Sequence, residues 1–340
     1  MVSTWPITFQ NKFSFAAILT DGSVVTWGDQ RIGGDSSAVQ DQLQNVQRIQ
    51  ATVGAFAAIL ANESVVTWGD QTYGANSSAV QHQLRNVQQI QAAYGAFAAI
   101  LGDGSVVTWG LPAFGGDTTA TQGRLRNVQE ILATSNAFAA ILADGSVVTW
   151  GDQQNGGDSS AVQHQLRNVQ EVHATRVAFA AILADGSVVT WGDQQNGGDS
   201  SAVQHQLRNV QEVHATLDAF AAILADGSVV TWGDQKSGGD SSAVQHQLRN
   251  VQDIHATLDA FAAILADGSV VTWGDQTYGA DSSAVQHHLR NVQLIHSTRQ
   301  FGGGSVGAFA AVLGDGSIVS WGDPSKGEVN SAVADQILYL

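Results

Sequence analysis

The chain has 340 residues and a formal net charge of −16, from 30 acidic and 14 basic side chains, and 44% of its residues are hydrophobic. It contains no cysteine, which excludes disulfides, thiolate metal sites and thiol-dependent catalysis. A chain this acidic repels phosphate backbones, so nucleic acid is excluded as an expected partner. The composition predicts a folded protein rather than an acidic disordered one.

The N-terminal stretch MVSTWPITFQNKFSFAAIL has no basic segment followed by a continuous apolar run, so we expect no signal peptide. No apolar run approaches the roughly 20 residues that span a bilayer. These features predict a soluble, cytoplasmic protein with no membrane partner.

The dipeptide Trp-Gly recurs along almost the whole chain, first at a constant spacing of 41 residues and finally after a step of 48. The longer step comes from an insertion, RQFGGGSVG, at 299–307. Such a period is the sign of a repeat architecture. The eight copies are marked by Trp27, Trp68, Trp109, Trp150, Trp191, Trp232, Trp273 and Trp321.

Each copy contains three short segments that predict β-strands, shown here by VQEVHAT (210–216), AFAAIL (219–224) and VVTWG (229–233). The Asp-Gly of ADGS (225–228) suits a tight hairpin that needs positive φ. Both faces of the second and third segments are apolar, so the sheet must be covered on both sides. Small sheets stacked blade on blade satisfy this pattern.

The segment SSAVQHQLRNV follows each third strand, and its pattern predicts a short amphipathic helix or at least a helical turn. Ser242 and Gln245 match a capping box. Val244, Leu248 and Val251 follow at helical spacing. A fourth strand is the alternative interpretation of this segment.

We therefore predict an all-β fold, a single β-propeller of seven or eight blades over residues 1–340, each with about three antiparallel strands and a short linking helix. The chain ends in SAVADQILYL (331–340), the linking segment that the first copy lacks. Circular closure by joining the two ends of the chain is the expected arrangement.

The stretch AFAAILADGSVVTWGD resembles the repeat of the regulator of chromosome condensation family, with its Asp-Gly turn and its apolar strand ending in Trp-Gly. The family's histidine at the start of the second strand is replaced by Ala219-Phe220, and its Gly-Gln-Leu-Gly tail by GGDSSAV. The resemblance covers about residues 7–340 and is nearest to the short-repeat branch that includes the propeller-type β-lactamase inhibitory protein. It implies a propeller fold, and the family's activities are too varied to imply one function.

The family's known activities can be compared with these residues. Giant HECT-type ubiquitin ligases with similar repeats need a catalytic cysteine, which this chain lacks. The chromatin-bound exchange factor uses basic extensions, and the plant UV-B photoreceptor uses a Gly-Trp-Arg-His-Thr run, and neither is present here. A substrate-recognition part or relative of such a ligase, or of a guanine-nucleotide exchange regulator, stays open as an alternative. So does a calcium- or carbohydrate-binding propeller.

Two columns of histidine and several aspartate pairs were considered as metal ligands. Duplication of tolerated histidines, and aspartates that cap turns, explain both patterns without a metal. We therefore expect no metal, no cofactor and no catalytic residue, so the protein is not predicted to be an enzyme. The histidine columns are His82, His164, His205, His246 and His287, and His173, His214, His255 and His296; the aspartate pairs are Asp152 with Asp158, Asp193 with Asp199, and Asp234 with Asp240.

The positions that differ between copies lie between the first and second strands and after the third strand. In an antiparallel meander these two windows share one end, and loops on a rigid scaffold commonly carry binding. Large aromatic residues stand there where solvent would favour small polar ones. We predict a protein-protein interaction scaffold, able to act as a monomer, whose protein partner contacts Tyr73, Tyr94, Phe114, Arg176, Tyr278, Arg299 and Phe301.

One hairpin departs from the repeat. The second copy reads ANES (61–64) where the other copies have Asp-Gly, so Glu63 stands where glycine takes positive φ. We predict strain at this position.

Overall fold

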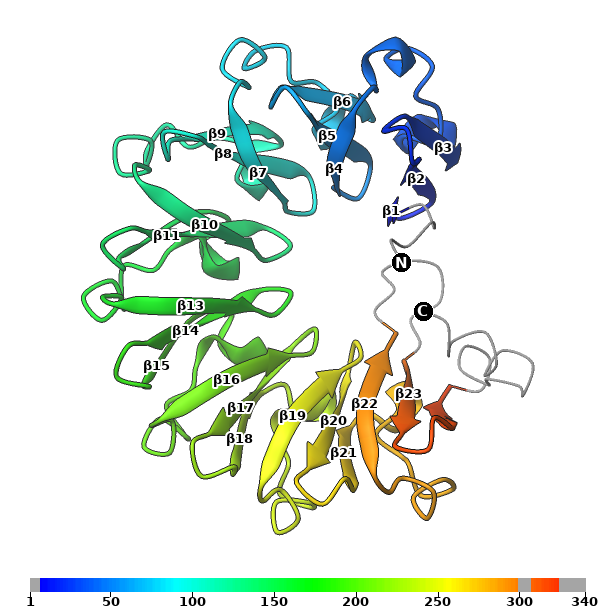
Figure 1. Ribbon diagram of the computed structural model, residues 1–340. Helices are drawn as coiled ribbons and strands as arrows, with labels where there is room; N and C mark the ends of the chain where they lie inside the picture. The colour runs from blue at the N-terminus through cyan, green and yellow to red at the C-terminus, as the bar shows by residue number, and fades with distance from the viewer. Residues whose placement is uncertain (1–6, 299–306, 324–340) are drawn as a thin grey trace. The chain divides into compact units, whose positions relative to one another are not determined.

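The structure is a computed structural model that describes residues 7–298 and 307–323. These residues form eight three-stranded antiparallel sheets, each in sequence order and one for each repeat (Figure 1). The predicted all-β fold is confirmed, with eight blades of the β-propeller type and three strands in each. The chain divides into two compact units, residues 1–172 and 173–340, so the single domain stays a prediction.

The first unit holds four sheets. Their strands are β1 (Ile7–Gln10), β2 (Ser14–Ile18) and β3 (Val24–Gly28); β4 (Val46–Ala51), β5 (Ala55–Leu60) and β6 (Val65–Gly69); β7 (Val87–Ala92), β8 (Ala96–Leu101) and β9 (Val106–Gly110); and β10 (Val128–Ala133), β11 (Ala137–Leu142) and β12 (Val147–Gly151).

The second unit holds the other four sheets, the first of which begins at the boundary between the units. Their strands are β13 (Val169–Ala174), β14 (Ala178–Leu183) and β15 (Val188–Gly192); β16 (Val210–Ala215), β17 (Ala219–Leu224) and β18 (Val229–Gly233); β19 (Val251–Ala256), β20 (Ala260–Leu265) and β21 (Val270–Gly274); and β22 (Val292–Ser297), β23 (Ala308–Leu313) and β24 (Ile318–Gly322).

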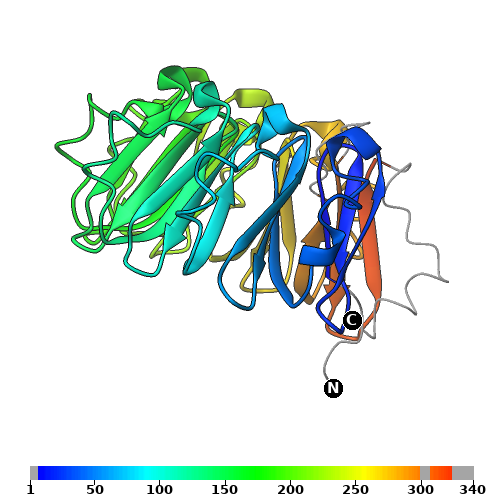
Figure 2. The same ribbon diagram turned by 90° about the horizontal axis from the view of Figure 1, so that it is seen from above.

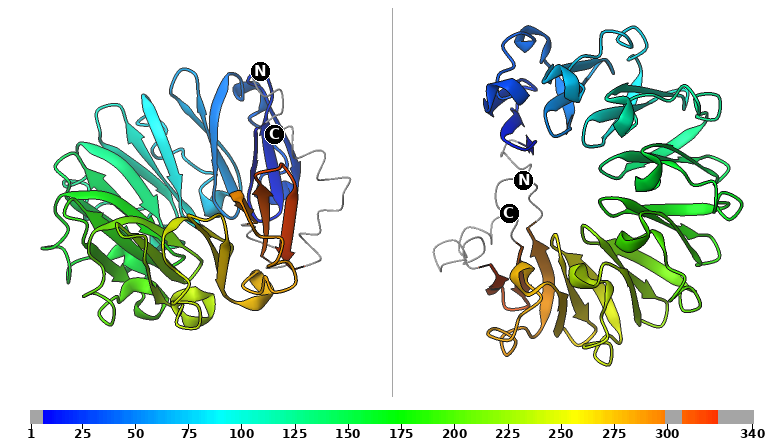
Figure 3. Two further views of the ribbon diagram at one scale, coloured as in Figure 1. Left: turned by 60° about the horizontal axis from the view of Figure 1, so that its bottom comes forward. Right: turned by 180° about the vertical axis from the view of Figure 1, so that it is seen from behind.

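The AFAAIL strand is central in its sheet and is buried on both faces. In the third sheet, Phe97 and Ala99 pack on the second sheet, while Ala96, Ala98 and Ile100 pack on the fourth. Alternate residues of a strand point to opposite faces, so a strand covered on both sides must be apolar throughout. The expectation of sheets stacked face to face is confirmed within each unit (Figure 3).

The tryptophan of most Trp-Gly pairs joins neighbouring repeats. Trp150 stacks on Phe138 of its own sheet at a centroid distance of 5.2 Å, and its Nε1 donates to the carbonyl of Gly115 at 3.1 Å. The same indole bond to a glycine about one repeat earlier is made by Trp68, Trp109, Trp232, Trp273 and Trp321. From Trp68 to Trp321 the tryptophan column is therefore core, as a buried indole with its N–H satisfied should be, whereas Trp27 of the first repeat is 44% exposed.

In the first seven sheets the third strand is followed by a short helical turn, and these turns lie at one end of their sheets within each unit (Figure 2). The amide of Asp70 donates to the carbonyl of Gly54 at 2.8 Å, which ties the exit of β6 to the β4–β5 loop. Both variable windows therefore share one end of a repeat, as predicted. The turns are η1 (Gln30–Ile32), η3 (Gln71–Tyr73), η4 (Pro112–Phe114), η5 (Gln153–Gly157), η6 (Gln194–Gly198), η7 (Gln235–Gly239) and η8 (Gln276–Tyr278).

The linking segment differs from its prediction. Residues 242–247 form successive turns rather than a regular helix, and only the first copy has a helical element here, η2 (Gln40–Gln42). Ser241, not Ser242, bonds Gln245, and the Gln245 amide then donates to the carbonyl of Val229 at 2.9 Å. The capping-box prediction was wrong because the Gln245 side chain bonds to Ser241 and to the third strand instead of to the amide of Ser242.

The apolar side of that segment is as predicted, since Leu248 and Val251 are buried and Val244 packs against the same core. A fourth strand is not formed in any sheet of the described residues. Residues 299–306 of the insertion and the tail at 331–340 lie outside the described residues. The predicted closure of the two ends of the chain therefore also falls outside them. Within 7–298 and 307–323 no helix has the length and apolarity to cross a membrane.

Candidate functional site

Three aromatic side chains gather at the variable end of the first unit. The rings of Tyr73 and Tyr94 meet edge to face with centroids 6.2 Å apart, and the rings of Tyr94 and Phe114 stack at 5.5 Å. Tyr73 ends η3, Tyr94 lies in the β7–β8 loop, and Phe114 ends η4. We call Tyr73, Tyr94 and Phe114 the aromatic patch.

Two glycines make room for the patch. A Cβ on Gly95 would lie 3.0 Å from Leu111 Cδ1 and 3.3 Å from both Phe114 and Tyr73. A Cβ on Gly54 would lie 3.0 Å from the Tyr73 ring. Because these contacts are tighter than ordinary van der Waals separations, the rings can rest on the backbone only where a side chain is missing.

Backbone hydrogen bonds between neighbouring repeats hold the loop that carries Tyr94. The amide of Val53 donates to the Tyr94 carbonyl at 3.0 Å, and the amide of Tyr94 donates to the Ser135 carbonyl at 2.7 Å. Thr52 Oγ1 donates to the Tyr73 carbonyl at 2.8 Å. These hydrogen bonds fix the backbone of the loops that carry the patch. Less conformational entropy is therefore lost when a partner binds.

The three rings are not equally exposed. Tyr94 is 43% exposed, whereas Tyr73 and Phe114 are half-buried and pack against the cores between successive sheets. Tyr94 is thus the side chain most available to a partner, and the other two support it.

Leu111 was missed by sequence reasoning. Its Cδ1 approaches Gly95 at the foot of the patch, and its position is occupied by aspartate in the other copies, such as Asp70 and Asp152. There the carboxylate caps the following turn, for example by accepting from the Thr72 amide at 2.7 Å. The loss of a capping aspartate to an apolar residue, followed by Pro112, was the signal that could have identified it.

The same end of the second unit is polar. Arg176 Nη2 lies 3.1 Å from Asp218 Oδ1, between equivalent loops of adjacent repeats. The amide of Arg176 donates to the Leu217 carbonyl, and that of Leu217 to the Leu258 carbonyl, both at 2.7 Å. Arg176 is therefore held in an ion pair on this surface.

Two partly buried carboxylates stand beside that ion pair. Burial raises the pKa of Asp218, and Arg176 opposes the rise. Burial also raises the pKa of Asp259, while a hydrogen bond from Ser237 Oγ at 2.8 Å opposes it. Neighbouring aspartates, including Asp234, raise both pKa values further, so this end of the second unit concentrates negative charge.

In the second unit, Tyr278 is the predicted binding residue that follows the third strand of the seventh repeat. Tyr278 is half-buried, packs against the core between the last two sheets, and accepts from Thr257 Oγ1 at 2.8 Å through its carbonyl. Arg299 and Phe301 lie outside the described residues.

The histidine and aspartate columns have distinct settings. The first histidine column, His82, His164, His205, His246 and His287, is exposed on the linking segments. The paired aspartates cap turns: Asp152 Oδ1 accepts from the Asn155 amide at 3.0 Å, and Asp158 Oδ1 from the Ser160 amide at 2.8 Å. In the second column, burial lowers the pKa of His214, although Asp253 and Glu212 act in the opposite direction.

Solved structures similar to this chain include repeat proteins of the predicted kind. The computationally designed Ika8 protein is 16% identical over 92% of this chain and 94% of its own, with a TM-score of 0.42. Human WBSCR16 is 14% identical over 68% of this chain and 77% of its own, with a TM-score of 0.45. Prp20p from Saccharomyces cerevisiae is 15% identical over 97% of this chain and 84% of its own, with a TM-score of 0.46.

Prp20 is also described as yeast RCC1. The resemblance to the regulator of chromosome condensation repeat rests on the repeat sequence itself, with its Asp-Gly turn and its strand ending in Trp-Gly. At these low identities the likeness concerns the fold alone. No family model matches the chain, and no curated protein matches it.

Proposed function

We propose that this chain is a protein-binding module and not an enzyme, and that its partner docks on the aromatic patch of the first unit. The observation that supports this is the contact between Tyr73, Tyr94 and Phe114, with Tyr94 43% exposed beside the apolar Leu111. An exposed aromatic cluster on a rigid loop is the kind of anchor on which binding energy concentrates.

The chemistry of the patch favours an apolar or aromatic side chain of a protein partner. Tyr94 can stack on such a group and still offer its hydroxyl as donor and acceptor at the edge. The fixed backbone of the loop means that little conformational freedom is lost on docking.

Tyr94→Ala is the variant that tests this proposal. Loss of a central aromatic anchor typically costs about 2 kcal/mol or more, which weakens binding roughly 30-fold. We expect the purified variant to stay folded and to lose, in a quantitative pull-down, the partner recovered by the wild type. Recovery of every partner at wild-type levels would contradict the proposal.

Tyr278→Ala is the matched control. Copies two and seven share the sequence DQTYGA, so Tyr278 is the counterpart of Tyr73 but has no place in the patch. We expect this variant to retain the partner. Equal loss of the partner in both variants would contradict the proposal, because Tyr278 is not one of the three residues of the aromatic patch.

A further inference from the structure

A second, chemically different cluster lies on the first strands of the second unit. Glu212 and His214 are two residues apart on β16, and Asp253 occupies on β19 the position that Glu212 has on β16. Residues two apart on a strand point to the same face, and β16 and β19 are neighbours. One strand thus supplies a carboxylate and an imidazole, and the next strand supplies a second carboxylate.

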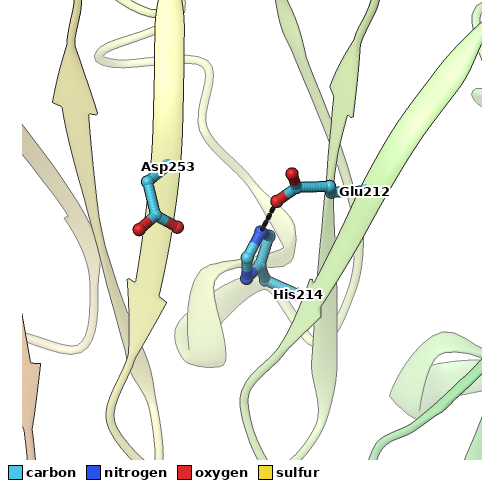
Figure 4. A group of neighbouring side chains, drawn as sticks. All are labelled: Glu212, His214 and Asp253. Carbon is cyan, nitrogen blue, oxygen red and sulfur yellow. Dashed lines mark hydrogen bonds and ion pairs between the residues drawn. The ribbon is translucent and has the colours of Figure 1, made fainter.

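The three side chains converge (Figure 4). One ligand atom from each of Glu212, His214 and Asp253 lies within 4.8 Å of the others. His214 Nε2 is 3.3 Å from Glu212 Oε2, and the imidazole stands between the two carboxylates. Among residues 7–298 and 307–323 this is the one group of three such side chains with that spacing.

A second histidine lies beside the far carboxylate. His255 Nε2 lies 3.0 Å from Asp253 Oδ2. An imidazole beside a ligating carboxylate is the arrangement that fixes ligand orientation in metal sites.

We propose that Glu212, His214 and Asp253 bind a divalent transition cation, and that zinc is the ion they suit best. Zinc accepts one imidazole nitrogen and two carboxylate oxygens at about 2.0–2.2 Å, with the fourth position open to water. Calcium and magnesium prefer sites made entirely of oxygen, so the histidine disfavours both. Glu212 is exposed, so its carboxylate is accessible to an ion from solvent.

The equivalent positions of other repeats show which residue types each pair of strands supplies. Glu171 and His173 on β13, followed by Glu212 on β16, repeat the pattern of Glu212, His214 and Asp253. On β22 the position of Asp253 is taken by Leu294, which leaves His296 without an acidic residue two positions earlier. On β10 the position of His214 is taken by Leu132. An acidic residue and a histidine on one strand, with an acidic residue on the next, are therefore necessary for such a group but do not define it. In the described part of the chain, Glu212, His214 and Asp253 are the residues whose ligand atoms lie within 4.8 Å of one another.

Zinc binding to the full chain, stripped with a chelator and titrated with zinc chloride in a calorimeter, tests the proposal. We expect one strong site per chain and a rise in melting temperature with zinc that calcium does not reproduce. His214→Gln should weaken that site at least about 10- to 100-fold, the range already seen when only outer-shell partners are lost. The glutamines Gln50 and Gln91 stand at this position in earlier repeats, so the substitution suits the fold.

His296→Gln is the matched control, because it removes a histidine of the same column without touching the cluster. The adjacent rings of His287 and His288, 3.9 Å apart, are a competing zinc site that His287→Gln removes. Both control variants should keep the strong site. Absence of stoichiometric zinc in the wild type, or unchanged zinc binding by the His214→Gln variant, would overturn the proposal.

Discussion

Glu63 is the only residue other than glycine and asparagine that has positive φ in the described part of the chain, at 62°. This is the conformation predicted from its place in the hairpin. The preceding Asn62 keeps the turn of the other copies, since its Oδ1 accepts from the Ser64 amide at 3.1 Å and from Ser64 Oγ at 2.7 Å. The turn is therefore preserved by its first residue and strained at its second.

Glu63→Gly should stabilise the protein. A side chain in the left-handed region costs on the order of 1 kcal/mol or more, and relief of that strain outweighs the added freedom of glycine in the unfolded chain. The expected gain is about 1 kcal/mol or less, measured as the free energy of unfolding in urea. Glu63→Ala serves as the control, because it removes the charge and keeps the Cβ. A gain of equal size from alanine would assign the effect to charge instead.

Between elements, the glycine that ends the turn after a third strand contacts the phenylalanine of the next repeat, as at Gly33, Gly74, Gly115, Gly197, Gly238 and Gly279. Gly197 has a φ of 105°, and a Cβ there would lie 2.6 Å from the ring of Phe220. Its carbonyl accepts the indole N–H of Trp232 at 3.1 Å. This glycine therefore serves both its backbone conformation and the packing of adjacent sheets.

Gly197→Ala should lower the free energy of unfolding by more than about 2 kcal/mol, because backbone strain and overpacking act together. Thermal unfolding followed by circular dichroism measures the loss. Gly123→Ala is the control, since a Cβ at Gly123 would meet no atom within 4 Å. If the Gly197→Ala and Gly123→Ala variants have the same melting temperature, the contact with Phe220 relaxes without cost. The sheets are then less tightly packed than the structure indicates.

At the scale of the whole molecule, the repeated turns give stability a common dependence on pH. In the Asp-Gly-Ser turns the carboxylate accepts from the serine amide and hydroxyl, as Asp226 does from Ser228 at 2.9 and 2.6 Å. The hydrogen bond from the serine hydroxyl is the main cause that lowers the pKa of each such aspartate below its ordinary value. The aspartates concerned are Asp21, Asp103, Asp144, Asp185, Asp226, Asp267 and Asp315.

The melting temperature should therefore fall as pH drops from about 5 to about 3. A carboxyl whose pKa is lower in the folded state stabilises that state above its unfolded pKa, and this contribution is lost as pH falls through the folded pKa. Asp218 and Asp259 act in the opposite sense, because their raised pKa values favour the folded state at low pH. Melting temperatures measured over this range, from about pH 5 to about pH 3, report the net effect of these two opposing contributions to stability.

A variant with Asp144, Asp185 and Asp226 changed to asparagine should show a shallower fall. Asn62 already occupies the equivalent position in the second copy, so the turn accepts asparagine. If the variant and the wild type have parallel profiles, groups other than the turn aspartates cause the acid sensitivity.

The sequence by itself determined the features that depend on neighbours along the chain. The three strands of each copy, the Asp-Gly hairpins and the positive φ of Glu63 follow from local alternation and turn chemistry, and their recurrence predicted eight similar sheets. The burial of the AFAAIL strands on both faces followed as well, because a strand without a polar face must be covered twice.

Only the tertiary structure decided the features that depend on partners distant in sequence. The linking segment forms turns because Gln245 reaches the carbonyl of Val229 in the third strand, a competitor that helical periodicity does not reveal. The contact of Tyr94 with Phe114, and that of His214 with the carboxylates, each require two repeats to be side by side at a particular distance. A repeat period states that such residues recur, whereas the spacing and register of adjacent sheets determine which of them meet.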